Sequence, residues 1–461
     1  MINAAYSDYR HSEVEWLDKV PVHWRNVPIK HMALAKESLF LDGDWIESKD
    51  ISGDEIRYIT TGNVGEGSYK EQGLGFISEE KFKQLDCTEV YEGDILISRL
   101  NAPIGRSCVV PNLQSKVVTS VDNVIFRPDE KYYKQFVVYL FSSKDYFKHT
   151  SNLARGATMQ RISRGLLGNI RVVIPSHDEQ QKIANFLDHE TAKIDTLIEK
   201  QQQLIKLLKE KRQAVISHAV TKGLNPNAPM RDSGVEWLDE VPEHWDLCMI
   251  KHKCLEITDG AHVSPETEGG EHYFVSITDI KKGVINFNDA LLTTSVSYEY
   301  LIKTRCMPFS GDILFSKDGT IGQTAITPPG IDFVVASSLI IIRPDHSRVI
   351  AEYLDFLLQS GMVKEQVESF VKGAALRRLS IQNLLKIGGA FPCISEQMEI
   401  SEYLACALSQ YDDLEADSSG LISLLKERRT ALISAAVTGK IDVRNWQAPK
   451  PSITSNKEVD A

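Results

Sequence analysis

Segments that would place the chain in a membrane or outside the cell are missing from the sequence. No stretch approaches the roughly 18 uninterrupted apolar residues that span a bilayer, and the opening MINAAYSDYRHSEVEW lacks the apolar core of a secretory signal. Cysteine is scarce, without any Cys-x-x-Cys pair and odd in number, at positions 87, 108, 248, 254, 306, 393 and 406. Neither a zinc site nor a disulfide framework is indicated. We expect a cytoplasmic protein with reduced thiols.

Catalytic signatures are missing as well. The chain has no Gly-x-x-x-x-Gly-Lys-[Ser/Thr] phosphate loop and no Asn/Asp-Pro-Pro-aromatic motif, and TGNVGEGSYK has Lys70 where a dinucleotide fingerprint needs a third glycine. The Pro-Asp pairs at 128–129 and 344–345 are not followed within about twenty residues by the Glu-x-Lys of a metal-dependent nuclease. His23 and His244 have no second ligand at metal spacing, so we interpret both as structural. The sequence therefore predicts no catalytic residue, no metal site and no cofactor bound by this chain.

What the sequence does contain is a long internal repeat. SEVEWLDKVPVHW, which ends at Trp24, agrees at ten of thirteen positions with SGVEWLDEVPEHW, which ends at Trp245. Later matches, such as EKRQAVISHAVT from Glu210 and ERRTALISAAVT from Glu427, lie 217 residues apart. A period of this length is too long for a solenoid, where 20 to 50 residues are typical, so each half is a domain with an appendage. We expect a pseudo-symmetric chain.

Each half changes in character near Pro175 and Pro392. Before them, short β-branched runs and Asn, Gly and Asp turns surround one helical stretch, which predicts mixed α+β domains. After them, apolar positions recur at spacings of four and three, the seam of a coiled coil. The predicted organisation is a domain over 1–180, a helix over 181–222, a domain over 223–396, a helix over 397–440 and a polar, flexible tail over 441–461.

The two predicted helices provide candidate interface residues, because a heptad seam must pack against something. From Leu187 to Ala219 the first helix would be about 50 Å long at 1.5 Å per residue, and the intervening domain lets the second helix return to pack on it. Core helices of one domain or a homodimer zipper remain alternatives, since heptads leave the partner open. The candidate interface residues are Leu187, Ile194, Ile198, Ile205, Leu208, Arg212, Leu404, Tyr411, Ile422, Leu425 and Arg429.

Positive charge is scarce overall and concentrated locally. The formal net charge is -11, which argues against a whole surface that grips nucleic acid but not against a local basic patch. The stretch between Tyr146 and His177 holds five Lys or Arg and no acid, and the stretch from Ser369 to Ser395 repeats this pattern. Both contain small RGAT or KGAA loops that let backbone N–H groups approach phosphate. Chance charge on a solvated loop is the alternative, which the recurrence in both halves disfavours.

These stretches predict a DNA-binding surface. The recurring basic loops contribute Lys148, Arg155, Thr158, Arg161, Arg164, Lys372, Arg377 and Arg378, and a second matched loop contributes Arg99, Arg106, Lys317 and Gln323. Two loops that share position but few side chains, YITTGNVGEGSYKEQGLG and FVSITDIKKGVINFND, add Thr61, Asn63 and Thr278. Divergent loops at equivalent places suit the reading of two different base sequences.

Several motifs occur in both halves: the VEWLDxVPxHW opening, GDILxS…IG, GAT…RIS with GAA…RLS, IP…EQ with FP…EQ, and the two helix ends. With these motifs the chain resembles the specificity subunits of type I restriction-modification systems over essentially its whole length. The resemblance implies two target-recognition domains that each read one half of a bipartite, asymmetric target. It implies two antiparallel helices between them that set the spacer and dock two methyltransferase subunits, which two nuclease-translocase subunits then join. S-adenosylmethionine, ATP and Mg²⁺ would belong to those partners, and this chain would be non-catalytic.

Two rival functions remain. A coiled-coil scaffold whose domains bind proteins would fit the acidity and the long helices, and a salt series of DNA binding separates it from a DNA reader. An enzyme with its own nuclease or methyltransferase activity is disfavoured by the missing motifs. An assay of the chain alone with S-adenosylmethionine and Mg²⁺ tests it.

Overall fold

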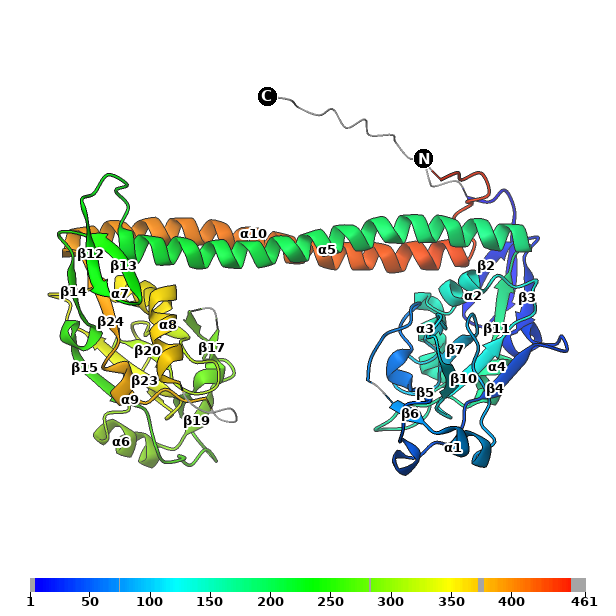
Figure 1. The fold of residues 1–461 in the computed structure, drawn as a ribbon, viewed down its shortest axis with the longest axis horizontal. Coiled ribbons are helices and arrows are strands. Elements are labelled where there is room, and N and C mark those ends of the chain that lie inside the picture. The colour runs from blue at the N-terminus through cyan, green and yellow to red at the C-terminus, as the bar shows by residue number, and fades with distance from the viewer. Residues whose placement is uncertain (1–4, 74, 282, 372–376, 449–461) are drawn as a thin grey trace, which may run out of the picture. The chain divides into compact units, whose positions relative to one another are not determined.

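The computed structural model describes residues 5–73, 75–281, 283–371 and 377–448 (Figure 1). Its contacts divide the chain into unit 1, which is Met1–Gln201 with Gly420–Ala461, and unit 2, which is Gln202–Ser419. Each unit holds one mixed α/β domain together with parts of two long helices, α5 (His177–Lys222) and α10 (Ile394–Val437). The predicted α+β class with long helices is therefore confirmed. Unit 1 combines an early stretch of the sequence with a late one.

The domain of unit 1 is built on two sheets. A four-stranded sheet has the order β4 (Leu39–Asp42), β10 (Asn123–Arg127), β7 (Ile95–Ser98) and β8 (Ser107–Val109). A three-stranded sheet has the order β6 (Gly75–Ile77), β5 (Ile56–Ile59) and β9 (Lys116–Thr119), and its β5–β9 pair is parallel. Strands β5 and β7 are buried along their whole length, which explains their continuous β-branched runs. The helices are α1 (Glu79–Gln84), α2 (Lys134–Leu140), α3 (Lys144–Leu153) and α4 (Arg164–Asn169).

The domain of unit 2 repeats this topology. Its four-stranded sheet has the order β15 (Cys254–Asp259), β23 (Leu339–Pro344), β20 (Ile313–Ser316) and β21 (Thr324–Ile326). Its three-stranded sheet has the order β19 (Leu291–Thr293), β16 (His272–Val275) and β22 (Phe333–Val335), again with one parallel pair. The extra pair β17 (Ile280–Lys281) and β18 (Val284–Ile285) has no named counterpart among the described strands of unit 1. The helices are α6 (Ser295–Lys303), α7 (Ala351–Gln359), α8 (Gly361–Phe370) and α9 (Ile381–Leu384).

The repeated opening motif forms a hairpin that ties each domain to the start of a long helix. The hairpins are β1 (Tyr9–Val14) with β2 (Leu17–Pro21), and β12 (Met230–Val235) with β13 (Leu238–Pro242). A further strand follows each hairpin and pairs with the strand before the long helix: β3 (Arg25–Pro28) with β11 (Arg171–Ile174), and β14 (Asp246–Met249) with β24 (Gly388–Phe391).

A carboxylate at the beginning of each long helix receives the motif's aromatic residues. The indole of Trp24 donates to Glu179 over 3.1 Å, and His23 lies 2.8 Å from the same carboxylate. Glu396 repeats both contacts at 3.1 and 2.8 Å. Both tryptophans are 1% exposed. These contacts give His23 and His244 the structural role inferred from the sequence.

The helices α5 and α10 pack against each other within each unit. In unit 1, Arg429 pairs with Asp195 over 2.9 Å, and in unit 2, Arg212 pairs with Asp412 over 2.7 Å. The two pairs are equivalent under the 217-residue offset, and they require antiparallel helices. The predicted seam therefore closes within one chain, which answers the homodimer alternative.

Of the stretch 441–461, which we expect to be a flexible tail, residues 441–448 are described and are packed on unit 1, and residues 449–461 lie outside the described residues. Ile441 and Val443 are 9% and 2% exposed and belong to the hydrophobic core of unit 1, and Trp446 packs against the same core. Every helix of the described residues is too short or too polar to span a lipid bilayer. Within the same residues, no group of three or more His, Cys, Asp or Glu side chains is placed to hold a metal ion.

Candidate nucleic-acid interface

The two basic loops of the first domain lie side by side, although nearly fifty residues separate them in the sequence. The backbone N–H of Asn101 donates to the carbonyl of Gln160 over 3.0 Å, and that of Ile162 donates to the carbonyl of Arg99 over 3.0 Å. Arg155 and Arg161 exchange two backbone hydrogen bonds of 2.9 Å, which close the second loop on itself. We call residues 99–106 and 155–161 the first-domain basic loops. The structure thus brings the two sequence candidates together.

Arg99 lies beneath these loops rather than on their surface. Its guanidinium forms an ion pair of 3.1 Å with Asp42 and donates to the carbonyls of Val121 and Ile162. The side chain is 6% exposed, and burial lowers the pKa of Arg99, an effect that Asp42 opposes. Our prediction placed Arg99 against DNA, but its charge is directed into the domain, where it holds the two loops together.

Lys317 takes the same position in the second domain. Its ammonium lies 2.5 Å from Asp259 and its side chain is 2% exposed. The backbone N–H of Leu379 donates to the carbonyl of Lys317 over 2.9 Å, as Ile162 does to Arg99 in the first domain. Lys317 is likewise placed as an internal anchor instead of a surface contact, because its side chain is buried and its charge already has a carboxylate partner.

Arg106 holds the backbone of neighbouring turns. Its guanidinium donates to the carbonyls of Val64, Thr61, Leu100 and Asn101 over 2.8 to 3.0 Å. These bonds tie loop 99–106 to the divergent loop that follows β5, and burial lowers the pKa of Arg106. The equivalent residue Gln323 is half-buried, and its backbone N–H donates to Ser316 over 2.8 Å. Arg106 therefore holds the loops of the predicted interface in position, because its N–H groups donate to backbone carbonyls of the protein itself.

Four further candidates of the first domain lie on loop 155–161 or at the first residue of α4. Arg155, Thr158 and Arg161 are exposed and Arg164 is half-buried. Arg161 lies 2.9 Å from Asp122, and Arg164 lies 3.6 Å from Asp42. Two of the three arginines thus meet a carboxylate, and the heads of all three are accessible to a polyanion. Their predicted phosphate contacts stay predictions.

The second domain places its cations similarly. Arg378 lies 3.1 Å from Asp318 on the loop that follows β20, and Arg377 pairs with Glu368. Both arginines are exposed. Lys372, the remaining candidate of this loop, lies outside the described residues.

The candidates from the divergent loops separate into one internal and two accessible residues. Asn63 is 1% exposed, and its side-chain amide donates to the carbonyls of Lys70 and Gln72, so it shapes the loop. Thr61 is half-buried and Thr278 is exposed. Of these three, Thr278 is the side chain best placed to meet a ligand.

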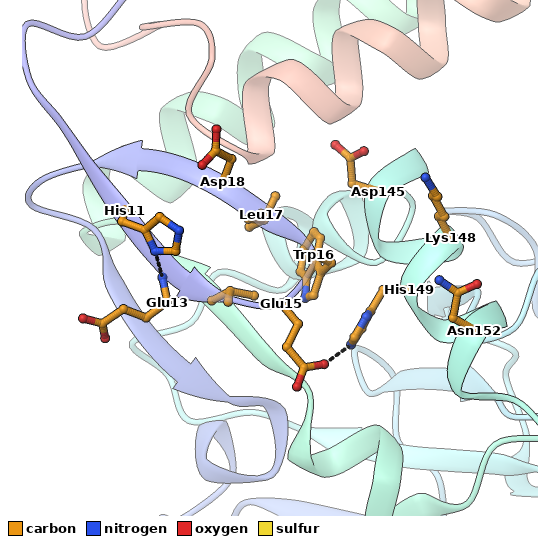
Figure 2. Close-up of a pocket in the computed structure, with 11 residues that line it drawn as sticks. His11, Glu13, Glu15, Trp16, Leu17, Asp18, Asp145, Lys148, His149 and Asn152 are labelled. Carbon is orange, nitrogen blue, oxygen red and sulfur yellow. Dashed lines mark hydrogen bonds and ion pairs between the residues drawn. The ribbon is translucent and has the colours of Figure 1, made fainter.

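Lys148 is separate from the basic loops. It lines a cleft of about 710 Å³ between the β1–β2 hairpin and α3, where Trp16 stacks on His149 (Figure 2). Glu15 lies 3.9 Å from His149, and the cleft is further lined by Glu13, Asp18 and Asp145. Four carboxylates around one lysine make this an unfavourable place for a phosphate.

The candidate interface residues of the helices mostly face the chain's own seam. Leu187, Ile194 and Leu425 are 0%, 5% and 8% exposed in unit 1, and Leu404 is 0% exposed in unit 2. The other candidates are half-buried: Ile198, Ile205, Leu208, Arg212, Tyr411, Ile422 and Arg429. These residues hold α5 against α10, so a separate subunit would meet other side chains.

Sequence reasoning missed exposed leucines that flank this seam. Leu197, Leu421 and Leu424 are 42 to 63% exposed in unit 1, and Leu204, Leu207 and Leu414 are 39 to 60% exposed in unit 2. The offset of 217 converts one set into the other. The recurrence of these leucines at the same offset in both halves was the sequence signal that could have identified them.

The carboxylates beneath the loops were missed as well. Asp42 and Asp259 each precede a glycine, and the two Asp-Gly pairs lie 217 residues apart. A Cβ on Gly43 or Gly260 would come within 2.4 or 2.1 Å of a backbone oxygen of the neighbouring segment, so only glycine fits there. The repeated Asp-Gly pair was therefore the sequence signal for the carboxylates that pair with Arg99 and Lys317.

A family model described as "Type I restriction modification DNA specificity domain" matches residues 21–207 and 246–419. The EcoKI specificity subunit of Escherichia coli strain K12 is 21% identical over 88% of this chain and 87% of that protein. The MjaIX specificity subunit of Methanocaldococcus jannaschii is 23% identical over 93% of this chain and 95% of its own length.

Solved structures share the fold. A chain described under complex assembly and conformational transition of the type I R-M system aligns with a TM-score of 0.68 and 15% identity, over 91% of this chain and 99% of that one. The HsdS subunit from Thermoanaerobacter tengcongensis aligns with a TM-score of 0.50 and 16% identity, over 91% and 98%. At these identities the structures establish the architecture alone.

Proposed function

Because the chain belongs to the type I restriction-modification DNA specificity family, we propose that it is the sequence-recognition subunit of such a complex. Each domain reads one half of a bipartite, asymmetric target in double-stranded DNA. The observation that carries the proposal is that both domains present exposed arginines on loops held from below by an equivalent ion pair with a buried cation, Asp42 with Arg99 and Asp259 with Lys317. Side chains above the anchor differ between the domains, as two different half-sites require.

Catalysis belongs to partner subunits in this proposal. Two methyltransferase subunits supply methyl transfer with S-adenosylmethionine, and two nuclease-translocase subunits supply ATP- and Mg²⁺-dependent cleavage. This chain contributes recognition, positioning and spacing, and it acts in the cytoplasm, where the DNA lies. Support comes from the missing catalytic motifs and from the acidic net charge, which leaves much of the grip on phosphate to the partners.

The methyltransferase subunits dock on the exposed leucines in this proposal. Exposed large apolar side chains that recur at helical spacing favour a protein partner. Leu197 and Leu421 occupy the same heptad position in unit 1, and Leu204 and Leu414 do so in unit 2. Equivalent positions of antiparallel helices lie on one side of the seam. Each unit therefore offers one apolar stripe, which suits two copies of one partner.

The test combines binding with methylation mapping. A complex reconstituted with its modification subunits should lose DNA affinity linearly in log–log plots against salt, because phosphate contacts release counterions. Exchange of the stretch between Trp24 and Pro175 with that of a related subunit should change one half-site in the methylome and leave the other intact. A change in both half-sites, or salt-independent binding, would contradict the two-reader model.

A further inference from the structure

The residues after α10 occupy a defined seat in unit 1. The ring of Trp446 packs edge-on against Phe186 with 5.6 Å between ring centroids, and lies 5.5 Å from His189. Lys182 on α5 donates to the carbonyl of Arg444 over 3.1 Å, which holds the segment in place. Phe186 is 0% exposed as a result.

The equivalent seat in unit 2 is an open groove of about 620 Å³. Tyr403, the counterpart of Phe186, lines it and is 48% exposed. Val215 and His218, the counterparts of Leu432 and Ala435, line it as well. In unit 1, Leu432, Ala435 and Trp446 all pack on the same hydrophobic core. The same backbone thus builds one filled seat and one unfilled seat.

The sequence explains why this seat is unfilled. The segment that follows α5 reads GLNPNAP and has Pro229 where the segment after α10 has Trp446. It then continues directly into β12 at Met230. The groove consequently keeps an apolar floor, and Leu224 at its edge is 40% exposed.

The groove continues the stripe on α5 to which we assign partner docking. Spacings of three and four residues connect the exposed leucines with the groove lining along one helical face: Leu204, Leu207, Lys211, Ala214 and His218. A subunit that covers the leucines of unit 2 therefore lies over the groove. The occupant in unit 1 shows which chemistry the seat accepts.

We propose that the groove lined by Tyr403, Val215 and His218 receives an aromatic side chain of the modification subunit that docks on unit 2. This inference rests on the proposed function and sharpens it. On unit 1 the chain's own Trp446 already fills the seat, so that docking position cannot accept the same ring. Two identical modification subunits then bind with different affinities, the tighter one on unit 2.

Titration of the full-length chain with its modification subunit, followed by native mass spectrometry, tests this. Tyr403→Ala should weaken one of the two binding steps by about thirtyfold, as loss of a buried aromatic anchor does. Ala214→Trp, which fills the groove from its edge, should weaken the same step. Met398→Ala removes an apolar side chain of α10 that is 50% exposed and does not line the groove, and it should leave both steps unchanged.

Each alternative outcome has a distinct meaning. If the wild-type chain binds no modification subunit, the proposed function fails and the groove inference fails with it. If the wild type binds two copies and both groove variants bind them with unchanged affinities, only the groove inference is overturned.

A probe on Cys406 gives an independent readout. This exposed cysteine is the counterpart of His189, which contacts Trp446 in unit 1. Bimane attached there in a Cys393→Ser background should shift its emission to the blue when the modification subunit is added, because the dye becomes buried. An unchanged emission at saturating subunit would overturn the proposal.

Discussion

The two domains hold the same loop in different ways. In the first, five carbonyls accept hydrogen bonds from the guanidinium of Arg106. In the second, Gln323 occupies that place, and the anchor Lys317 with Asp259 lies beneath it. Both domains therefore contain this ion pair with its buried cation, but only the first adds a second cation to its turns. The ion pair thus belongs to the fold that both domains share, whereas the hydrogen bonds of Arg106 belong to the loop of the first domain alone.

The largest effect should come from removing the side chain of Arg106. Arg106→Ala deletes five charge-assisted hydrogen bonds and leaves partly buried carbonyls unpaired, which should cost about 3 kcal/mol in the free energy of unfolding. Reading of one half-site should be lost. The matched change Gln323→Ala should stay within about 0.5 kcal/mol. Urea unfolding and methylation mapping measure both, and equal losses for the two variants would remove the distinction.

A second comparison concerns the exposed arginines. Arg161→Ala with Arg164→Ala should flatten the salt dependence of DNA binding by up to about two units of slope, and Arg377→Ala with Arg378→Ala should do the same from the other domain. Lysine replacements at these positions should restore most of the slope, since they keep the charge. Mobility-shift titrations across a salt series provide the measurement. An unchanged slope would take that pair out of the interface.

A third difference is a buried carboxyl that only the second domain has. Burial raises the pKa of Asp355 on α7 to about 6, and Val138 takes the equivalent place in the first domain. A folded-state pKa above the unfolded value means that the folded state retains the proton, so stability falls as pH rises from about 4 to 6 and stays reduced above. Asp355→Asn should therefore stabilise the protein by about 1 to 2 kcal/mol at pH 8 and hardly at pH 4. The urea unfolding midpoints of the wild type and the variant at both pH values measure this difference. A stabilisation that does not depend on pH would contradict a raised pKa of Asp355.

The smallest expected change concerns spacing. Four residues inserted in α5 after Gln201 and four in α10 after Ser418 add about 6 Å to each helix. If the helices set the spacer, the unspecified gap in the target should grow by one or two base pairs while both half-site sequences stay the same. Methylation mapping of the insertion variant would show this. Altered half-site bases with an unchanged gap would argue that the domains, and not the helices, determine spacing.

The duplication and the long helices could be predicted from the sequence because both are periodic signals. Seam positions such as Leu187 and Leu404 follow from heptad spacing alone. The direction of a side chain on a loop carries no such signal, which is why Arg99 and Lys317 were expected at the surface. Their burial depends on Asp42 and Asp259, more than fifty residues earlier in the sequence. The packing of Trp446 on unit 1 could not be predicted from the sequence either, because a tail of mixed composition has no periodic pattern of apolar residues.

The ion pair beneath the loops has a consequence for how such a protein evolves. Asp42 and Arg99 join the two loops from below, whereas the side chains of Arg155 and Thr158 are exposed. Mutations at those surface positions therefore cost little folding free energy, because exposed residues away from anchors usually change stability by less than about 0.5 kcal/mol. A lineage can explore new target sequences by point mutation or by exchange of a whole domain without first losing the scaffold. Selection on specificity and selection on stability act on different residues of the same loops.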